Sequence, residues 1–329
     1  MKTGKLDWSS MSKLLSLLPS AEEDVIVGPA QGEDAAVIRV RDGFLVIHTD
    51  PITTGVRKIG YLAINVAGND IAVRGVAPKW FLATILLPER FEYELVEEIF
   101  ADMSTALKEI KGVMIGGHTE VSPGLERPII NVTAAGYTLK KPLFTRDARP
   151  GDILYAVGRI GGEGAGVIAW DFTEQLRSLG VDEKDIETAK GFIYDVSVIN
   201  VALGIRDVIT TMHDATEGGL LQAVREIAVA SGTKAVLEID DSMLDPIVVK
   251  ITRVLGIDPL RLLSSGCVVA SVSPENTMEL ETILEKIKKP YYRIGRLEKG
   301  DGEVVVKYRD MTSAIREDIV DEIYKLWRQ

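Results

Sequence analysis

Five short segments of this sequence each place an acidic or imidazole side chain among residues that are too small to bury it. They are Gly32–Ala36, His48–Asp50, Gly68–Asp70, Gly116–Glu120 and His213–Thr216. Carboxylates at the edges of apolar runs are costly to desolvate unless a cation or hydrogen-bond donors meet them. The segments share one pattern, a small residue followed by Asp or His beside Thr or Asn. This recurrence indicates a single oxygen-rich site.

Such a site is suited to binding a hard divalent cation. Mg²⁺ takes oxygen ligands and is commonly held by a few carboxylates together with substrate phosphates. Zn²⁺ is disfavoured because the sequence holds one cysteine, Cys267, and 3 histidines. The sequence has no Walker A pattern, and its glycine-rich stretch 158–166 lacks the spacing of a dinucleotide fingerprint. A single Asp at a strand end is often only a turn or cap residue, but the set together predicts a Mg²⁺-nucleotide site of another type.

Composition excludes several classes of function. The 329 residues are enough for two domains, and 38 Lys and Arg against 49 Asp and Glu give a net charge of −11, which argues against nucleic-acid binding. No apolar run approaches the roughly 18 residues of a membrane span, and the N-terminal sequence has no apolar core of signal-peptide length. We therefore expect a cytoplasmic protein with no membrane partner. Cys267 lies in an apolar run and is expected to be a buried structural thiol rather than a nucleophile.

A hairpin is expected to bring the first two acidic segments together. Two β-rich runs, 35–40 and 43–49, are joined at Asp42-Gly43, which is a hairpin signal. Asp34 and Asp50 then lie at the outer ends of the two strands. Because these ends are neighbours in an antiparallel pair, the two carboxylates should meet at one rim.

The third segment belongs to a predicted helix over 59–75, rich in small residues. Asn69 and Asp70 lie side by side in it. An alternative for Asp70 is an ion pair with Arg74, four residues on, across a solvated helix surface.

The fourth segment follows a strand, 113–115, that is expected to stop at Gly116. Paired glycines after a strand let the backbone approach a phosphate and turn its N–H groups toward it. Strand 81–87 and helix 92–110 precede this motif, and strand 129–137 follows it.

A polar Pro-Gly turn at 146–152 makes a credible domain boundary. In the second half, Thr216 is expected to cap a helix over 218–230, with Asp214 facing the start of that helix. A last helix is expected over 317–327. Each half is thus α+β.

These motifs together resemble a known family over nearly the whole chain. In order they are Gly-Glu-Asp-Ala-Ala-Val, Thr-Asp, Asn-Asp-Ile-Ala-Val-Arg-Gly-Val-Ala-Pro, Gly-Gly-His-Thr, Arg-Pro-Gly-Asp with Gly-Arg-Ile-Gly-Gly-Glu-Gly, and Asp-Ala-Thr-Glu-Gly-Gly-Leu. They resemble the PurM-like aminoimidazole ribonucleotide (AIR) synthase superfamily. Its members include AIR synthase, thiamine-monophosphate kinase, selenophosphate synthetase and the hydrogenase maturation protein HypE. HypE and its archaeal relatives are the most similar.

The resemblance implies a two-domain PurM-like fold. Residues 1–147 would form an N-terminal sheet domain that binds ATP and Mg²⁺ and makes a barrel with a second copy, and residues 148–329 an α+β domain. ATP would lie near the dimer and domain interfaces. The positions that match metal ligands in relatives are Asp34, Asp50, Asp70 and Asp214. The positions that match nucleotide-binding residues are Gly32, Asn69, Gly116, Gly117, His118 and Thr119.

Three departures narrow the expected activity. HypE acts on a C-terminal cysteine, whereas this sequence ends Leu326-Trp327-Arg328-Gln329, so we expect that it does not run that reaction on itself. Selenophosphate synthetase needs a reactive Cys or Sec in its N-terminal arm, which is not present in residues 1–6. Many relatives have Asp where His118 stands, which replaces a carboxylate with a neutral or cationic donor.

The leading hypothesis is a HypE-like, ATP- and Mg²⁺-dependent enzyme that phosphorylates or dehydrates an amide-type or other oxygen acceptor. The acceptor would be a small molecule or a side chain of a partner protein. One alternative is a non-catalytic, dimeric nucleotide-binding paralogue in a maturation complex. Another is an enzyme of the thiamine-monophosphate kinase or AIR synthase type.

Overall fold

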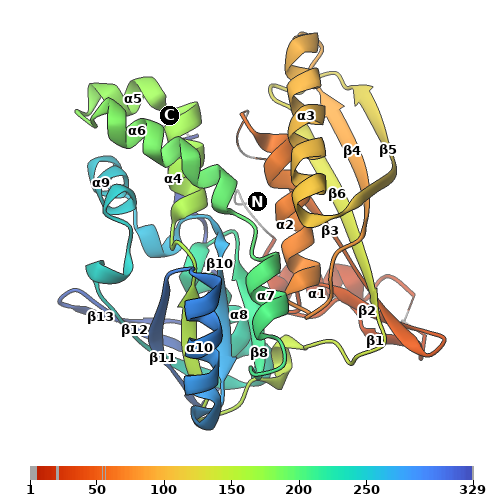
Figure 1. The fold of residues 1–329 in the computed structure, drawn as a ribbon, viewed down its shortest axis with the longest axis vertical. Coiled ribbons are helices and arrows are strands. Elements are labelled where there is room, and N and C mark those ends of the chain that lie inside the picture. The colour runs from red at the N-terminus through yellow and green to blue at the C-terminus, as the bar shows by residue number, and fades with distance from the viewer. Residues whose placement is uncertain (1–5, 20–21, 54, 56, 328–329) are drawn as a thin grey trace.

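A computed structural model describes residues 6–19, 22–53, 55 and 57–327, and Figure 1 shows its two sheets side by side with helices between and around them. The first sheet has the order β1-β2-β3-β6-β4-β5. Its strands are β1 Val25–Val27, β2 Ala36–Val40, β3 Gly43–Ile52, β4 Trp80–Leu87, β5 Val113–Val121 and β6 Ile129–Thr138. Its helices are α1 Trp8–Leu15, α2 Ile59–Ala72 and α3 Tyr93–Ile110.

The second sheet has the order β13-β12-β9-β11-β7-β10-β8. Its strands are β7 Ile153–Val157, β8 Thr211–Ala215, β9 Thr233–Ile239, β10 Ser264–Val272, β11 Tyr291–Lys299, β12 Val304–Tyr308 and β13 Met311–Ile315. The helices are α4 Gly162–Asp171, α5 Thr173–Ser178, α6 Glu183–Lys190, α7 Ile199–Ile205, α8 Gly219–Ser231, α9 Pro246–Leu255 and α10 Thr277–Ile287. Short 3₁₀ helices are η1 Thr145–Asp147, η2 Gly191–Asp195, η3 Asp241–Met243, η4 Pro259–Arg261, η5 Pro274–Asn276 and η6 Glu322–Lys325.

The predicted hairpin forms as expected. Strand β2 pairs antiparallel with β3 from Val40↔Gly43 to Ala36↔Ile47. Strand β3 continues beyond the predicted end and pairs with β6 as far as Ile52↔Ile130. Asp50 therefore lies within a strand, opposite Val132.

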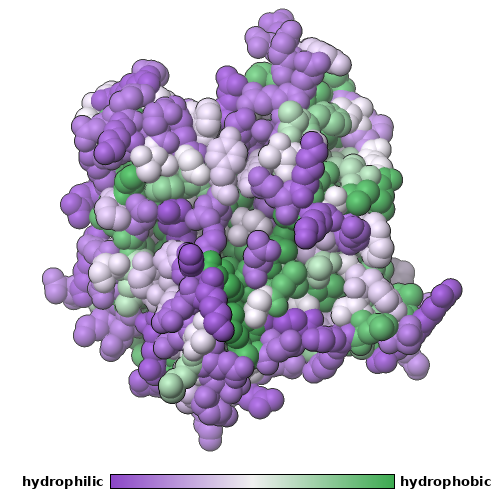
Figure 2. Space-filling view, viewed as in Figure 1, coloured by the Kyte–Doolittle hydropathy of each residue, from purple (hydrophilic) through white to green (hydrophobic). Residues whose placement is uncertain are grey.

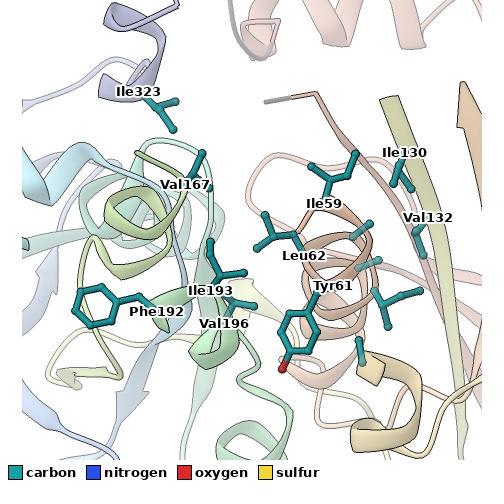
Figure 3. Packing of buried hydrophobic residues seen from close by; sticks show 14 of the residues in the cluster. Ile59, Tyr61, Leu62, Ile130, Val132, Val167, Phe192, Ile193, Val196 and Ile323 are labelled. Carbon is teal, nitrogen blue, oxygen red and sulfur yellow. The ribbon is translucent and has the colours of Figure 1, made fainter. Parts of the chain in front are cut away.

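Helix α2 joins the two domains. All 14 of its residues are buried, because one side packs on β3, β6 and α3 and the other faces the second domain. Gly60 allows this packing: a Cβ added there would lie 2.2 Å from the carbonyl oxygen of Ile99 in α3. In Figure 3, Leu62 and Tyr61 of α2 face Val167, Ile193 and Val196 of the second domain. One hydrophobic core thus continues across the domain boundary.

Several local predictions are wrong. The strand expected to stop at 115 continues through Gly116–Thr119 to Val121, because these residues pair with β4. The helix expected over 317–327 is reduced to η6, Glu322–Lys325. Thr216 does not cap α8, whose N-cap is Gly218 in the left-handed region, φ 82°.

Within the described residues, no single helix is both long and apolar enough to cross a membrane. One bent pair, Glu183–Asp195 with Ile199–Ile205, passes the length and composition criteria only when its two parts are taken together.

Candidate functional site

Four of the five segments that carry an acidic or imidazole side chain meet at one cleft between the two domains. The cleft has a volume of about 860 Å³. Its lining includes Gly32 and Asp34 before β2, His48 and Asp50 on β3, Asp70 on α2, and His213 on β8. Asp34 and Asp50 thus share a rim, as the hairpin argument predicted. The convergence needs both domains, because β8 belongs to the second sheet.

Asp34 is the most constrained acid of this cleft. Its Oδ2 accepts one hydrogen bond from Nη2 of the Arg74 guanidinium, and its Oδ1 lies 2.6 Å from His213 Nε2. Burial alone would raise the pKa of Asp34, but the charges of His213 and Arg74 outweigh it and lower the pKa to about 2. Asp34 is therefore ionised at neutral pH.

His213 lies between carboxylates. Besides Asp34, its Nε2 is 3.1 Å from Glu226 Oε2, and its Nδ1 is 2.7 Å from the Asp214 backbone oxygen. Burial would lower the pKa of His213, but Asp34 and Glu226 outweigh it and raise the pKa well above 6.5. The imidazole is therefore a cation that bridges the two domains.

Arg74 does not form the surface ion pair with Asp70 that helical spacing allowed. Its side chain is fully buried, and it contacts Glu33 and Asp34. Asp70 is itself buried, and its Oδ2 lies 3.5 Å from His48 Nε2 across the cleft. The solvated-surface alternative is therefore wrong, because α2 lies inside the molecule.

Asn69 has a structural position. Its Nδ2 donates to the backbone oxygens of Val196 and Ser265, at 2.9 and 3.1 Å, and its Oδ1 accepts from the Val198 N–H at 2.9 Å. All three partners are backbone groups of the second domain. Both ends of this buried amide are thus engaged in joining the domains. Its assignment to the nucleotide stays a prediction from the resemblance.

Gly32 is required by close packing between the domains. Its φ is +78°, and a Cβ added there would lie 2.5 Å from the Glu226 backbone oxygen on α8. A side chain would push the loop before β2 away from α8. This would separate Asp34 from His213.

The segment Gly116–Thr119 lies apart from the acids. It sits on β5, at the opposite edge of the first sheet from the β2–β3 hairpin. Asp50 and Gly117 occupy one cross-strand row, separated by three strand spacings, or roughly 14 Å. The structure does not bring the two sets together within one chain.

Gly116–Thr119 instead lines a groove of about 480 Å³ beside α3, together with Phe100, Met103 and Leu107. The glycines have a role in strand pairing, since a Cβ on Gly117 would lie 2.2 Å from the Ala83 carbonyl oxygen of β4. His118 is exposed, with Nε2 2.9 Å from Glu120 Oε2. The segment is therefore an extended strand rather than a loop, and its assignment to the nucleotide phosphates stays a prediction.

A smaller pocket adjoins the cleft and contains two further buried acids, Glu163 and Asp321, of which the sequence does not indicate Asp321. Its volume is about 70 Å³, and it shares Asp50, Thr216 and Glu217 with the cleft. Glu163 is buried there, and its carboxylate accepts from Ser265 Oγ at 2.6 Å. Asp321, which also lines the pocket, accepts from the Gly218 N–H at 2.8 Å. Burial raises the pKa of Asp321 to about 7.

The four acids predicted to bind Mg²⁺ differ in their contacts, and their assignment as ligands stays a prediction. Asp50 and Asp70 line the cleft, and Asp214 lies next to it, with Oδ1 3.9 Å from His213 Nδ1. These carboxylates are the hard oxygen donors that Mg²⁺ prefers. One ligand atom each from Asp34, His213 and Asp214 also lie within 4.8 Å of one another. However, cationic groups already contact both oxygens of Asp34.

Cys267 is fully buried in β10, and burial raises the pKa of its thiol to about 12. This confirms the prediction of a structural thiol, because a thiolate nucleophile requires a lowered pKa.

Comparison with known proteins places the chain among relatives of hydrogenase maturation proteins. It is 28% identical over 276 residues to a putative hydrogenase expression/formation protein of Methanocaldococcus jannaschii, covering 79% of this chain and 77% of that one. It is 29% identical over 254 residues to the carbamoyl dehydratase HypE of Bradyrhizobium diazoefficiens, covering 75% and 71%. The crystal structure of hydrogenase maturation protein HypE in complex with ATP has the same fold, with a TM-score of 0.69 at 23% identity, covering 94% and 90%.

Family models match both halves of the chain. Residues 32–138 match the N-terminal domain of AIR synthase related protein, and residues 149–307 match its C-terminal domain. The predicted boundary between 147 and 148 falls between these matches and stays a prediction. The cleft that gathers Asp34, Asp50, Asp70 and His213 lies between the two matched domains. The chain belongs to the AIR synthase related, PurM-like family.

Proposed function

We propose that this protein is a HypE-like enzyme that uses ATP and Mg²⁺ to phosphorylate or dehydrate an amide-type or other oxygen acceptor. The observation that carries the proposal is the convergence of acids from both domains on one cleft, in a chain of this family. A solved relative is described as a complex with ATP, and a curated relative as a carbamoyl dehydratase. We infer, as part of this proposal, that the protein acts in the cytoplasm.

Asp50, Asp70 and Asp214 are the residues that would hold Mg²⁺. The bound ion would offset the charge that develops on the transferred phosphoryl group. The protein's own groups would orient these ligands: His48 lies against Asp70, and the His213 imidazole is fixed beside Asp214 by Asp34 and Glu226. The buried walls would exclude water from the reacting phosphate.

A homodimer would complete the nucleotide site. The face of the first sheet that points away from α2 exposes large apolar side chains, among them Trp80, Leu82 and Ile115. Figure 2 shows hydrophobic residues between hydrophilic ones on this side of the molecule, at the right of the view. Contiguous apolar surface of this kind is typical of protein interfaces. A second copy on this face could bring its own β5 toward the nucleotide, which one chain alone does not do.

The acceptor would enter the small pocket next to Asp50. Glu163, Ser265 and Tyr324 present polar groups there, beside the apolar Leu62 and Val167. Asp50 belongs to both the cleft and this pocket, so an acceptor oxygen could approach a phosphate held in the cleft. This arrangement suits a small, uncharged polar group such as an amide.

A nucleotide-binding paralogue without catalysis is the second candidate. It is favoured by one observation, the neutralisation of Asp34 by Arg74 and His213, which removes one carboxylate from the predicted metal set. ATP turnover in the presence of a co-purified partner or of small amides would separate the two candidates.

Calorimetry tests the first requirement of the proposal, which is Mg²⁺-dependent nucleotide binding. The purified protein should bind a non-hydrolysable ATP analogue only when Mg²⁺ is present. Asp50→Asn should abolish the Mg²⁺-dependent part of this binding. Binding that is equal with and without Mg²⁺, or unchanged in Asp50→Asn, would refute it.

A further inference from the structure

The one fully enclosed basic side chain of the described residues lies directly behind the acid cleft. Arg74 has a relative exposure of 0%, whereas His213 and Arg225, the other buried basic residues in the described part, are 4% and 8% exposed. Arg74 follows the C-terminal end of α2. A guanidinium remains charged at every accessible pH, so its positive charge is a fixed part of the site.

The Arg74 guanidinium donates hydrogen bonds to protein groups on most of its sides. Nη1 donates to Glu33 Oε2 at 2.7 Å and to the Leu143 backbone oxygen at 3.4 Å. Nη2 donates to Asp34 and, at 2.7 Å, to Thr145 Oγ1. Leu143 and Thr145 belong to the segment that connects the two domains. Arg74 is thus held from three directions and cannot turn away from Asp34 without breaking these bonds.

The two oxygens of Asp34 therefore contact two different side chains of the protein. Oδ2 meets Arg74, and Oδ1 lies 2.6 Å from His213 Nε2. A divalent ion bound to Asp34 would lie beside the guanidinium charge of Arg74, which is fixed in place and repels it. The geometry around Asp34 consequently does not suit a Mg²⁺ ion.

We infer that Arg74 takes the place of a metal ion at Asp34. The site would then hold its metal through Asp50, Asp70 and Asp214, and Asp34 would be a positioning residue that fixes His213 and joins the domains. This inference rests on the proposed function, because it concerns the same nucleotide site. The site would then bind fewer divalent ions than one in which all four acids, Asp34, Asp50, Asp70 and Asp214, are metal ligands.

Manganese binding tests the inference without reference to catalysis. Free Mn²⁺ is followed by electron paramagnetic resonance during titration of the protein, saturated with a non-hydrolysable ATP analogue. Asp34→Asn should leave the number of bound Mn²⁺ ions unchanged, because it removes no ligand, and any loss of affinity should be smaller than that of Asp50→Asn. Asp50→Asn removes a proposed ligand and should lower the affinity at least about tenfold. Equal losses in the two variants would overturn the inference.

Removing the resident cation is the complementary experiment. Arg74→Gln should bind one additional Mn²⁺ per chain, and the Arg74→Gln/Asp34→Asn double variant should lose it again. Glu33→Gln is the matched control, because it removes the other carboxylate partner of Arg74 while leaving the cation beside Asp34. Circular dichroism establishes folding. If Arg74→Gln does not fold, the Asp34→Asn titration decides alone, and a folded Arg74→Gln with no additional Mn²⁺ contradicts the inference.

The two hypotheses can fail separately. If the unaltered protein binds no Mn²⁺ with the nucleotide analogue, the proposed function fails. If it binds Mn²⁺ and Asp34→Asn weakens binding as much as Asp50→Asn does, only the role of Arg74 fails.

Discussion

The acid cleft and the β5 edge carry similar sequence motifs but have opposite structural environments. In the cleft, Asp34 and His213 come from different domains and are buried against each other. On β5, His118 is exposed and contacts Glu120 on its own strand. Motifs of the same kind therefore have two different structural environments within one chain. What distinguishes the cleft is that elements of two domains meet there.

The largest expected difference between the two regions is in metal-dependent nucleotide binding. Losing a residue that only holds a metal ligand in place typically lowers metal affinity roughly 10–100-fold. Asp50→Asn removes a proposed ligand itself, so it should lower the affinity for the Mg²⁺-nucleotide by more than this. Asp42→Asn, at the turn of the same hairpin, is the matched control. Titration calorimetry gives both affinities. Similar values for the two variants would contradict the assignment of the cleft.

The second prediction compares two asparagines. Asn69→Ala should lower the free energy of unfolding by about 2–4 kcal/mol, because it leaves buried backbone groups of Val196, Val198 and Ser265 without their partner. Asn131→Ala, on the outer face of the first sheet, should lower it by only about 1 kcal/mol or less, because the hydrogen bonds between Asn131 and Thr49 are exposed to water. Urea denaturation measures both. A small effect at Asn69 would show that the amide does not hold the domains together.

The third prediction concerns adjacent glycines of β5. Gly117→Ala should destabilise the protein by about 1–3 kcal/mol, because the new methyl group would meet backbone 2.2 Å away at Ala83. Gly116→Ala should cost less, since its nearest neighbour is the mobile end of Leu82 at 3.2 Å. Thermal unfolding compares them. The reverse order would indicate that these glycines are not required by strand pairing.

The fourth prediction is the pH dependence of stability at the cleft. The pKa of Asp34 is lowered to about 2 from 3.8, so its contribution, on the order of 2 kcal/mol, is present above pH 4 and is lost as the pH falls toward 2. The pKa of His213 is raised above 6.5, so its contribution is complete below pH 6.5 and is lost as the pH rises through the raised value.

Denaturation curves at several pH values measure both limbs. His213→Gln should remove the alkaline loss of stability. An alkaline loss that persists in this variant would assign it to another group.

The smallest effect is expected at His118. His118→Ala removes an exposed ion pair with Glu120, so the free energy of unfolding should change by less than about 0.5 kcal/mol. Any larger change should appear in nucleotide affinity and only where the protein is dimeric. Sedimentation velocity and calorimetry on the same sample check this. A large loss of stability would mean that His118 has contacts that the single chain does not contain.

Local patterns were sufficient to predict much of the fold. The β2–β3 hairpin, α3, β6 and α8 follow from Asp-Gly turns and hydrophobic periodicity, and their observed bounds lie close to the expected ones. Strand β5 was cut short because paired glycines resemble a loop, whereas the parallel pairing with β4 keeps them extended. The helix expected over 317–327 does not form, because Asp321 accepts a hydrogen bond from the Gly218 N–H and caps η6.

The sequence predicts which acids belong to the site but not the hydrogen bonds and ion pairs that connect them. The hairpin placed Asp34 near Asp50 by local geometry alone. The structural roles of Arg74 and Glu163 do not follow from the sequence, because helical spacing pairs Arg74 with Asp70 on a surface and the glycine-rich stretch around Glu163 does not indicate its partner. Both roles depend on contacts between distant segments: Glu33 with Arg74, and Glu163 with Ser265. A sequence pattern identifies such residues only when their partners are also known.

Hydrogen exchange tests most directly the claim that both regions contribute to one nucleotide site. Amide exchange is measured by mass spectrometry with and without Mg²⁺ and a non-hydrolysable ATP analogue. The account predicts slower exchange on nucleotide binding both in the segments around Asp50 and Asp214 and in Gly116–Val121 of β5. Slower exchange around the acids alone would exclude β5 from the site, and unchanged exchange in both regions at saturating nucleotide would contradict the account.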